Sequence, residues 1–139
     1  MAPRDRKARF EDIEAIAMAL PEAATRTTFG DRPAYAVRGK NFVSFREPRP
    51  DAIDPDTGER MTDVVIVWVP DESAKESLVQ SDGPWFTTPH FDGYPAVLVR
   101  QRDLGALTHS ELQEVITDGW AARAPKRLVS EYFTSRGVD

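Results

Sequence analysis

Residues 62–70, TDVVIVWVP, decide the fold of this chain. Every position from Val64 to Val69 is apolar, and Pro70 follows directly. A strand that is apolar on both faces belongs inside a sheet, because both of its faces need cover from water. A proline ends such a strand, since it cannot donate a ladder hydrogen bond. The stretch therefore predicts a central strand with a layer of structure over each face of its sheet.

The residues before this strand predict a helix and a β-hairpin. In RFEDIEAIAMALP, residues 9–21, apolar side chains recur at helical spacing up to the proline. In PAYAVRGKNFVSFR, residues 33–46, two short apolar runs flank Gly39, which we expect to form the turn. On the second strand we expect Phe42 to lie on the opposite face from Val43 and Phe45.

A long acidic loop is predicted between the hairpin and the central strand. Residues 47–61, EPRPDAIDPDTGERM, contain three prolines, one glycine and several acids. Such a composition breaks both helix and strand. A loop of this length is uncommon in a compact domain.

The residues after the central strand predict further helices and one more apolar strand. Asp71 can cap a short helix over residues 71–79. PWFTTPHFDGYPAVLVR, residues 84–100, predicts a short strand, a turn and an apolar strand. Two helices close the chain, one opened by the capping box of Thr108 and Glu111 and one beginning near Pro125.

Helices at both ends thus enclose strands that we expect to be antiparallel. This order predicts an α+β fold, an antiparallel sheet with helices packed on it, because alternating βαβ units are lacking. The length of 139 residues predicts a single domain over residues 1–139, with residues 1–8 as a flexible basic leader.

Composition excludes several kinds of chemistry. The chain has no cysteine, which removes disulfides, thiolate metal sites and cysteine nucleophiles and fits a cytoplasmic protein. No stretch approaches the length of a membrane span. No phosphate-binding, dinucleotide-binding or nucleophile-elbow motif is present, and the acidic loop lacks the spacing of a calcium loop. We expect no metal, no cofactor and no membrane association, and we expect a monomer.

Charge is distributed unevenly along the chain. The net charge is −5, yet residues 1–50 contain ten Lys and Arg against seven Asp and Glu, whereas residues 51–139 contain eight against sixteen. An acidic protein binds nucleic acid only through a local basic patch. Such a patch should therefore come mostly from the N-terminal part.

Taken together, the ALPEA helix end, the PAYAVRGKNFVSF hairpin, PWFTTPHFDGYPAVLVR and GWAARAPKRLVSEY resemble the MmcQ/YjbR family of small bacterial proteins. The resemblance covers nearly the whole chain, from Phe10 to Tyr132, and rests on the order of the segments. It implies a CyaY-like (frataxin-like) α+β fold. It also implies DNA binding through a double-wing arrangement, and no catalytic residue.

The hairpin supplies the first candidate site. Arg38 and Lys40 flank Gly39 at its tip, Arg46 and Arg49 follow its second strand, and Arg9 belongs to the basic leader. A wing uses such cations to contact phosphates, which gives weak, salt-dependent and non-specific DNA binding. The alternative, that these residues are ordinary solvated surface, is the more common situation.

The segment 84–100 supplies the second candidate site. Trp85, Phe86, Phe91 and Tyr94 could stack on bases, as in single-strand binding proteins, or anchor the turn in the core, which burial statistics favour. Together with His90 they form a candidate surface for an unknown protein or ligand.

His90 also lies close in sequence to Asp92, so an acid–base role is conceivable. A lone histidine supplies neither a nucleophile nor a second catalytic group, so we predict a turn histidine and no enzyme.

Overall fold

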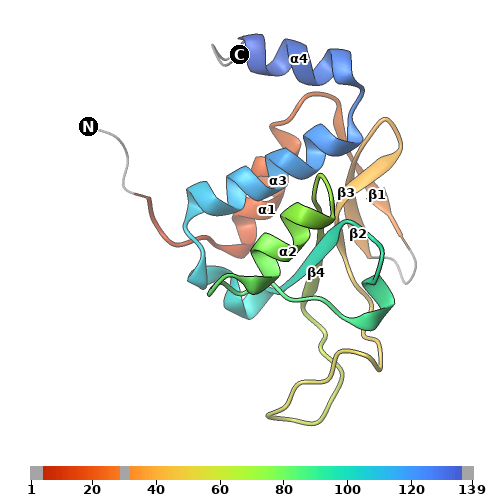
Figure 1. The fold of residues 1–139 in the computed structure, drawn as a ribbon, viewed down its shortest axis with the longest axis vertical. Helices are drawn as coiled ribbons and strands as arrows, with labels where there is room; N and C mark the ends of the chain where they lie inside the picture. Colours follow the sequence, from red (N-terminus) through yellow and green to blue (C-terminus); the bar gives the residue numbers. More distant parts are fainter. Residues whose placement is uncertain (1–4, 29–31, 136–139) are drawn as a thin grey trace.

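A five-stranded antiparallel sheet with the strand order β1-β2-β3-β4-β5 forms the centre of the molecule (Figure 1). The computed structural model describes residues 5–28 and 32–135. The predicted α+β class with an antiparallel sheet is confirmed, and the strand predicted from TDVVIVWVP lies inside the sheet with a neighbour on each side. The strands are β1 (Ala23–Thr27), β2 (Pro33–Val37), β3 (Lys40–Phe45), β4 (Val64–Trp68) and β5 (Ala96–Arg100).

The predicted helices all form. They are α1 (Phe10–Met18), α2 (Glu72–Gln80), α3 (His109–Arg123) and α4 (Lys126–Ser135), with the short 3₁₀ helices η2 (Pro89–Phe91) and η3 (Gln101–Ala106). Asp71 accepts a hydrogen bond from the Ala74 amide and so caps α2, and the capping box predicted for α3 is present. No helix in the described part of the chain is long and apolar enough to cross a membrane.

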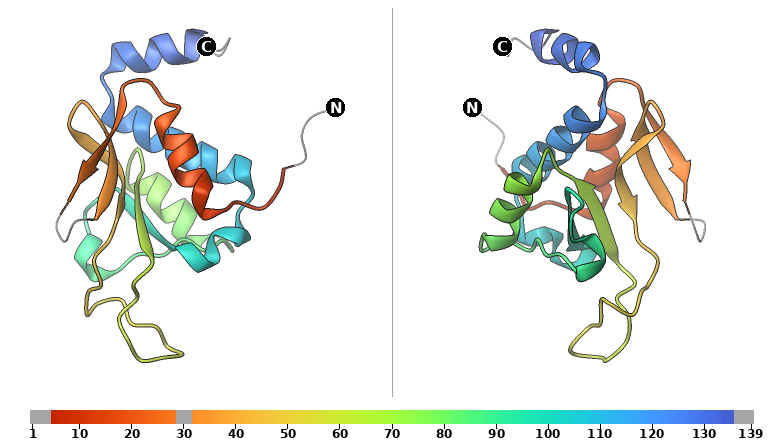
Figure 2. Two further views of the ribbon diagram at one scale, coloured as in Figure 1. Left: turned by 180° about the vertical axis from the view of Figure 1, so that it is seen from behind. Right: turned by 45° about the vertical axis from the view of Figure 1, so that its right-hand side comes forward.

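Alternation of side chains along the strands gives the sheet two different faces. Helices α1 and α3 cover one face, the inner face, which Figure 2 shows from two sides. Large apolar side chains fill the space beneath these helices. One row across four neighbouring strands consists of Tyr35, Val43, Val67 and Val97, all buried in the main core.

The opposite, outer face is covered over only part of its width. The row beside the previous one runs through Arg26, Ala34, Ser44, Ile66 and Leu98. Its last two members belong to a second apolar cluster, which the segment before β5 covers with half-buried Phe86 and buried Phe91. The predicted strand around Phe86 is reduced to a single bridge with Leu98.

A β-bulge changes the predicted pattern of β3. The register between β2 and β3 shifts between Tyr35 and Ala36, which leaves Phe42 as an extra residue. Phe42 and Val43 are consequently both buried in the main core, so the prediction that they lie on opposite faces is wrong. The turn before them consists of Arg38 and Gly39, both with positive φ (50° and 80°), as a tight two-residue hairpin requires.

The basic leader is partly ordered against α3. Ala8 is buried and its amide donates to the Leu107 carbonyl, while the His109 amide donates to the Arg6 carbonyl. The Arg6 side chain forms two hydrogen bonds with Asp12, which lower the pKa of this carboxyl to about 2. Of the predicted leader, residues 5–8 thus contact the start of α3 and the turn before it, and residues 1–4 lie outside the described residues.

The acidic loop projects beyond one end of the sheet (Figure 1) but is fixed at its base. Asp54 is buried, and its carboxylate accepts hydrogen bonds from Arg100 at 2.9 Å and Arg102 at 3.1 Å. Arg100 also donates to Asp63 at 2.8 Å. Arg100 at the end of β5 and Arg102 in η3 thus neutralise Asp54 of the predicted loop and Asp63 just after it.

Gly119 provides a test of how closely α3 packs on β4. A Cβ atom at this position would lie 2.4 Å from the Trp68 carbonyl oxygen. Alanine favours a helix over glycine by about 1 kcal/mol, yet we expect Gly119→Ala to reduce the free energy of unfolding by about 2 kcal/mol because helix or strand must move. Urea denaturation measures the change.

Gly105→Ala is the matched control, because a Cβ atom there would meet nothing within 4 Å. If both variants unfold at the same urea concentration as the original chain, α3 does not approach β4 as closely as described.

Candidate nucleic-acid interface

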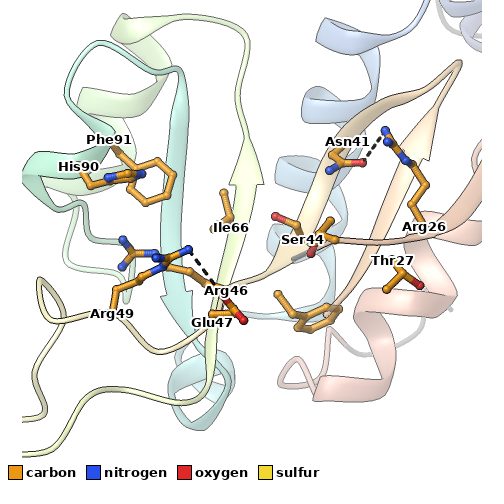
Figure 3. A pocket seen from close by; sticks show the side chains of 12 residues that line it. Arg26, Thr27, Asn41, Ser44, Arg46, Glu47, Arg49, Ile66, His90 and Phe91 are labelled. Atoms are coloured by element: carbon orange, nitrogen blue, oxygen red, sulfur yellow. Dashed lines mark hydrogen bonds and ion pairs between the residues drawn. The ribbon is translucent and has the colours of Figure 1, made fainter. Parts of the chain in front are cut away.

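An open hollow of about 630 Å³ lies on the outer face of the sheet, between β1 and η2 (Figure 3). We call it the outer hollow. Nine of its twelve lining residues are polar, among them three arginines and a single acid. The lining residues are Arg26, Thr27, Thr28, Asn41, Ser44, Phe45, Arg46, Glu47, Arg49, Ile66, His90 and Phe91.

The outer hollow exists because side chains on this part of the sheet are small. Strand β2 contributes only Ala34 and Ala36 to the outer face, and β3 contributes Ser44 to the same row. The next strand, β4, contributes the large side chain of Ile66 to this row, and η2 packs over it through Phe91. We call η2 the wall of the outer hollow. A floor of small residues beside such a wall leaves a concave surface.

Arg26 connects the outer hollow with the hairpin tip. Its Nη1 atom donates to the carbonyl oxygen of Gly39 at 2.5 Å and contacts Oδ1 of Asn41 at 3.4 Å. None of its partners in the described part of the chain is an acid, so its charge stays uncompensated. The side chain is exposed at the end of the hollow opposite His90 (Figure 3).

Arg46 has a structural role that its position after the hairpin did not indicate. It is only 8% exposed, and its two terminal nitrogens each lie 2.9 Å from a carboxylate oxygen of Asp51. Only the Nη2 contact has the geometry of a hydrogen bond. The buried Nη1 atom interacts with the Asp51 carboxylate through electrostatic attraction without a hydrogen bond. The guanidinium carbon lies 5.1 Å from the centre of the Phe91 ring. Arg46 therefore supports the wall of the hollow instead of offering a free charge.

Asp51 joins the acidic loop to the η2 wall. Besides its pair with Arg46, it accepts a hydrogen bond of 2.8 Å from the Thr88 hydroxyl, directly before η2. The hydrogen bond from Arg46, and to a smaller extent that from Thr88, lowers the pKa of this carboxyl. Arg49, from the same loop, is exposed and has one acidic neighbour, Glu47, at 3.5 Å.

The hairpin tip carries two cations, Arg38, which is paired with an acid, and Lys40, which is not paired with any described residue. Arg38 forms a two-pronged salt bridge with Glu22, which raises the pKa of the guanidinium and lowers that of the carboxyl. Lys40 is exposed and has no ion pair with the described residues. Arg9 lies elsewhere, at the N-cap of α1, and does not line the outer hollow.

The aromatic residues of segment 84–100 are divided between core and surface. Trp85 and Phe91 are buried and anchor the segment, Phe86 is half-buried, and Tyr94 is 57% exposed. These residues therefore do not form a row of exposed rings.

Lys75 on α2 is buried, which the sequence did not indicate. Its Nζ atom donates to the carbonyls of Phe91 and Tyr94 at 2.6 and 2.8 Å, which fixes the turn after η2.

His90 and Asp92 line different hollows. His90 is exposed in the outer hollow, with its ring centre 5.1 Å from that of Phe91. Asp92 lines a hollow of about 350 Å³ beside α2. No hydrogen bond joins them within residues 5–28 and 32–135. Across the same residues, no group of three or more His, Cys, Asp or Glu gathers in a way that could hold a metal ion.

Arg26 is the important residue that the sequence analysis missed. It lies on β1, which was not predicted because AATRT, residues 23–27, follows a proline and lacks large apolar residues. The signal that was available is the pair of β-branched threonines at alternate positions, typical of an edge strand with one solvated face.

Comparison with known proteins adds a family assignment to this geometry. The YjbR family model matches residues 18–122. The chain belongs to the YjbR family. This YjbR protein is also similar to uncharacterized protein Rv2570 of Mycobacterium tuberculosis and uncharacterized protein Mb2600 of Mycobacterium bovis, each 47% identical over 76 residues. The matched region spans 54% of this chain and 57% of each relative. No solved structure matches.

The link between Arg46, Asp51 and Thr88 can be tested by Asp51→Ala. The substitution leaves a buried guanidinium without its carboxylate. Buried pairs cost several kcal/mol to break and exposed pairs less than 1, so for this half-shielded pair we expect a loss of about 2 kcal/mol in the free energy of unfolding at pH 7. Asp56→Ala, in the same loop and exposed, should change it little.

The pH dependence gives an independent check. Because the pKa of Asp51 is lowered in the folded protein, its contribution is present above the pKa of the unfolded carboxyl and is lost as pH falls through the folded value. Urea denaturation should therefore show a smaller difference between original chain and Asp51→Ala at pH 3 than at pH 7. A difference that is constant with pH would contradict the ion pair.

Proposed function

We propose that this YjbR protein binds DNA weakly and without sequence preference, through phosphate contacts on the outer face of its sheet. The binding surface consists of Lys40 and Arg38 at the hairpin tip together with Arg26 and Arg49 in the outer hollow. The observation that carries the proposal is the contact from Arg26 to the Gly39 carbonyl, since it makes tip and hollow one basic surface.

The charges on this surface favour an anionic ligand. The whole chain is acidic, with a net charge of −5, but Arg26 and Lys40 have no acidic partner among the described residues. Arg49 pairs with Glu47 at 3.5 Å. Uncompensated cations on a concave surface concentrate the positive potential, which attracts phosphates. Arg46, predicted as a contact residue, is instead assigned to supporting the wall, because it is buried as well as paired with Asp51, whereas Arg38 is exposed beside Glu22.

The fold favours contacts to phosphates over readout of bases in a duplex. Helices α1 and α3 pack with their apolar faces against the inner face of the sheet (Figure 2), and at its end α3 meets the hairpin through Arg123, which donates to the Asn41 carbonyl. A recognition helix in the major groove would need an exposed face beside the cations. Contacts to phosphates alone position a protein on DNA without specifying sequence.

A second candidate function is a ligand-binding domain without catalytic activity. The mixed polar and apolar lining of the outer hollow and its volume of about 630 Å³ favour it, since small-molecule sites commonly measure roughly 300–1,000 Å³. We assign no catalytic role to His90, because none of the described residues brings a second acid–base group into hydrogen-bonding distance of it.

Fluorescence anisotropy with labelled DNA tests the DNA proposal. We expect binding at low salt that weakens steeply as salt rises, because each phosphate contact releases counterions. The double variant Arg26→Ala, Lys40→Ala should weaken binding about tenfold and reduce the slope of log K against log salt by about 2.

The control is the double variant Arg60→Ala, Lys7→Ala, which removes the same charge from exposed positions that do not line the outer hollow or the hairpin tip. Absence of binding by the original chain at low salt would refute the proposal. Equal loss of affinity in both double variants would show that net charge, and not this surface, determines binding.

A further inference from the structure

We infer that the outer hollow holds one unstacked nucleotide of a single-stranded nucleic acid. The inference rests on the proposed function and narrows it, because a general basic surface would bind duplex and single strand alike. It follows from the size of the hollow, the position of its cations and the free polar groups on its floor.

The hollow is too narrow for a duplex but wide enough for one strand. It extends from β1 to β4, which is three strand spacings or roughly 14 Å. The major groove of a duplex alone is about 12 Å wide, so a whole duplex can rest only on the rim. A single nucleotide fits within a volume of about 630 Å³.

Cations stand at both ends of this space. Arg26 lies at the β1 end, and Arg49 lies at the η2 end beside His90 (Figure 3). A strand that crosses the hollow would place one phosphate near each guanidinium, with its base between them. This is the arrangement expected of a groove that follows a single strand.

The floor between the cations offers hydrogen bonds to a base. Ser44 is only 7% exposed, and its hydroxyl makes no hydrogen bond within the described part of the chain. Among the described residues, the Asn41 side chain has one contact, a long one accepted from Arg26, so its NH₂ group is available to donate. A hydroxyl and an amide both donate and accept, so they suit the polar edge of a base.

The wall at the η2 end offers an aromatic surface that is held in place. His90 is exposed and packs at 75° on the Phe91 ring, which Arg46 covers at 5.1 Å. Thr88 and Asp51 fix the start of η2, and Lys75 fixes its end. The imidazole is thus the exposed ring on which a base entering from the solvent side can stack.

Filling the hollow provides the test. Ser44→Leu places an apolar side chain on the floor without changing charge. Anisotropy titrations would compare a labelled 12-nucleotide single strand with the duplex of the same sequence, both at one low salt concentration. We expect Ser44→Leu to weaken single-strand binding about tenfold and to change duplex binding less than about twofold. Ser130→Leu, the same substitution at an exposed position on α4, should change neither.

Three outcomes would overturn the inference. Ser44→Leu could leave single-strand binding unchanged, or it could weaken single strand and duplex equally. Alternatively, free deoxyadenosine monophosphate could displace the labelled strand at micromolar concentration, which would make the hollow a site for small phosphate esters. If neither form of DNA binds the original chain, the proposed function itself fails, a result distinct from these three.

A measurement on the unmodified chain covers the case in which Ser44→Leu does not fold. Amide resonances can be followed by NMR during titration with the single strand and with the duplex. We expect the amides of Asn41, Ser44 and His90 to shift with the single strand and to shift much less with the duplex. Shifts confined to the hairpin tip in both titrations would contradict the inference.

Discussion

Strands β4 and β5 are apolar on both faces, and water has to be excluded from both sides of them. The remaining architecture depends on this requirement. Helices α1 and α3 provide one layer, and the segment between α2 and β5 provides the other. That second layer is short, because a segment bracketed by prolines contributes only Phe86 and Phe91 to the outer cluster. It therefore ends over β4, and the hollow begins where it ends.

The position of the segment 84–95 is maintained by two charged groups, buried Lys75 and partly shielded Asp51. Lys75 reaches it from α2, and Asp51 reaches it from the acidic loop through Thr88. Isolated buried charges are costly, whereas charges with several partners are tolerated. These hydrogen bonds thus hold together three segments far apart in the sequence and support the wall of the candidate site.

The sequence predicts elements where periodicity is strong and fails where a contact depends on tertiary structure. The apolar run of β4, the capping box at Thr108 and the glycine turn at Gly39 each act locally, and each was found as predicted. The bulge at Phe42 and the buried state of Arg46 depend on which strands and loops become neighbours. A cation after a hairpin has the same local pattern whether it points to solvent or to Asp51, so the sequence alone could not separate contact residues from supporting ones.

The anchoring of the acidic loop has a consequence for modifying this protein. Both ends of the loop are fixed, by Arg46 on one side and by Arg100 on the other, while Ile53 and Arg60 close a small bridge between them. The tip around Gly58 is exposed, and a Cβ atom added to Gly58 would have no other atom within 4 Å. Extending a closed loop at its tip adds little conformational entropy cost. A label or peptide inserted next to Thr57 therefore lies away from the sheet and its hollow, provided that the Asp56 and Gly58 amides keep their hydrogen bonds to Asp54.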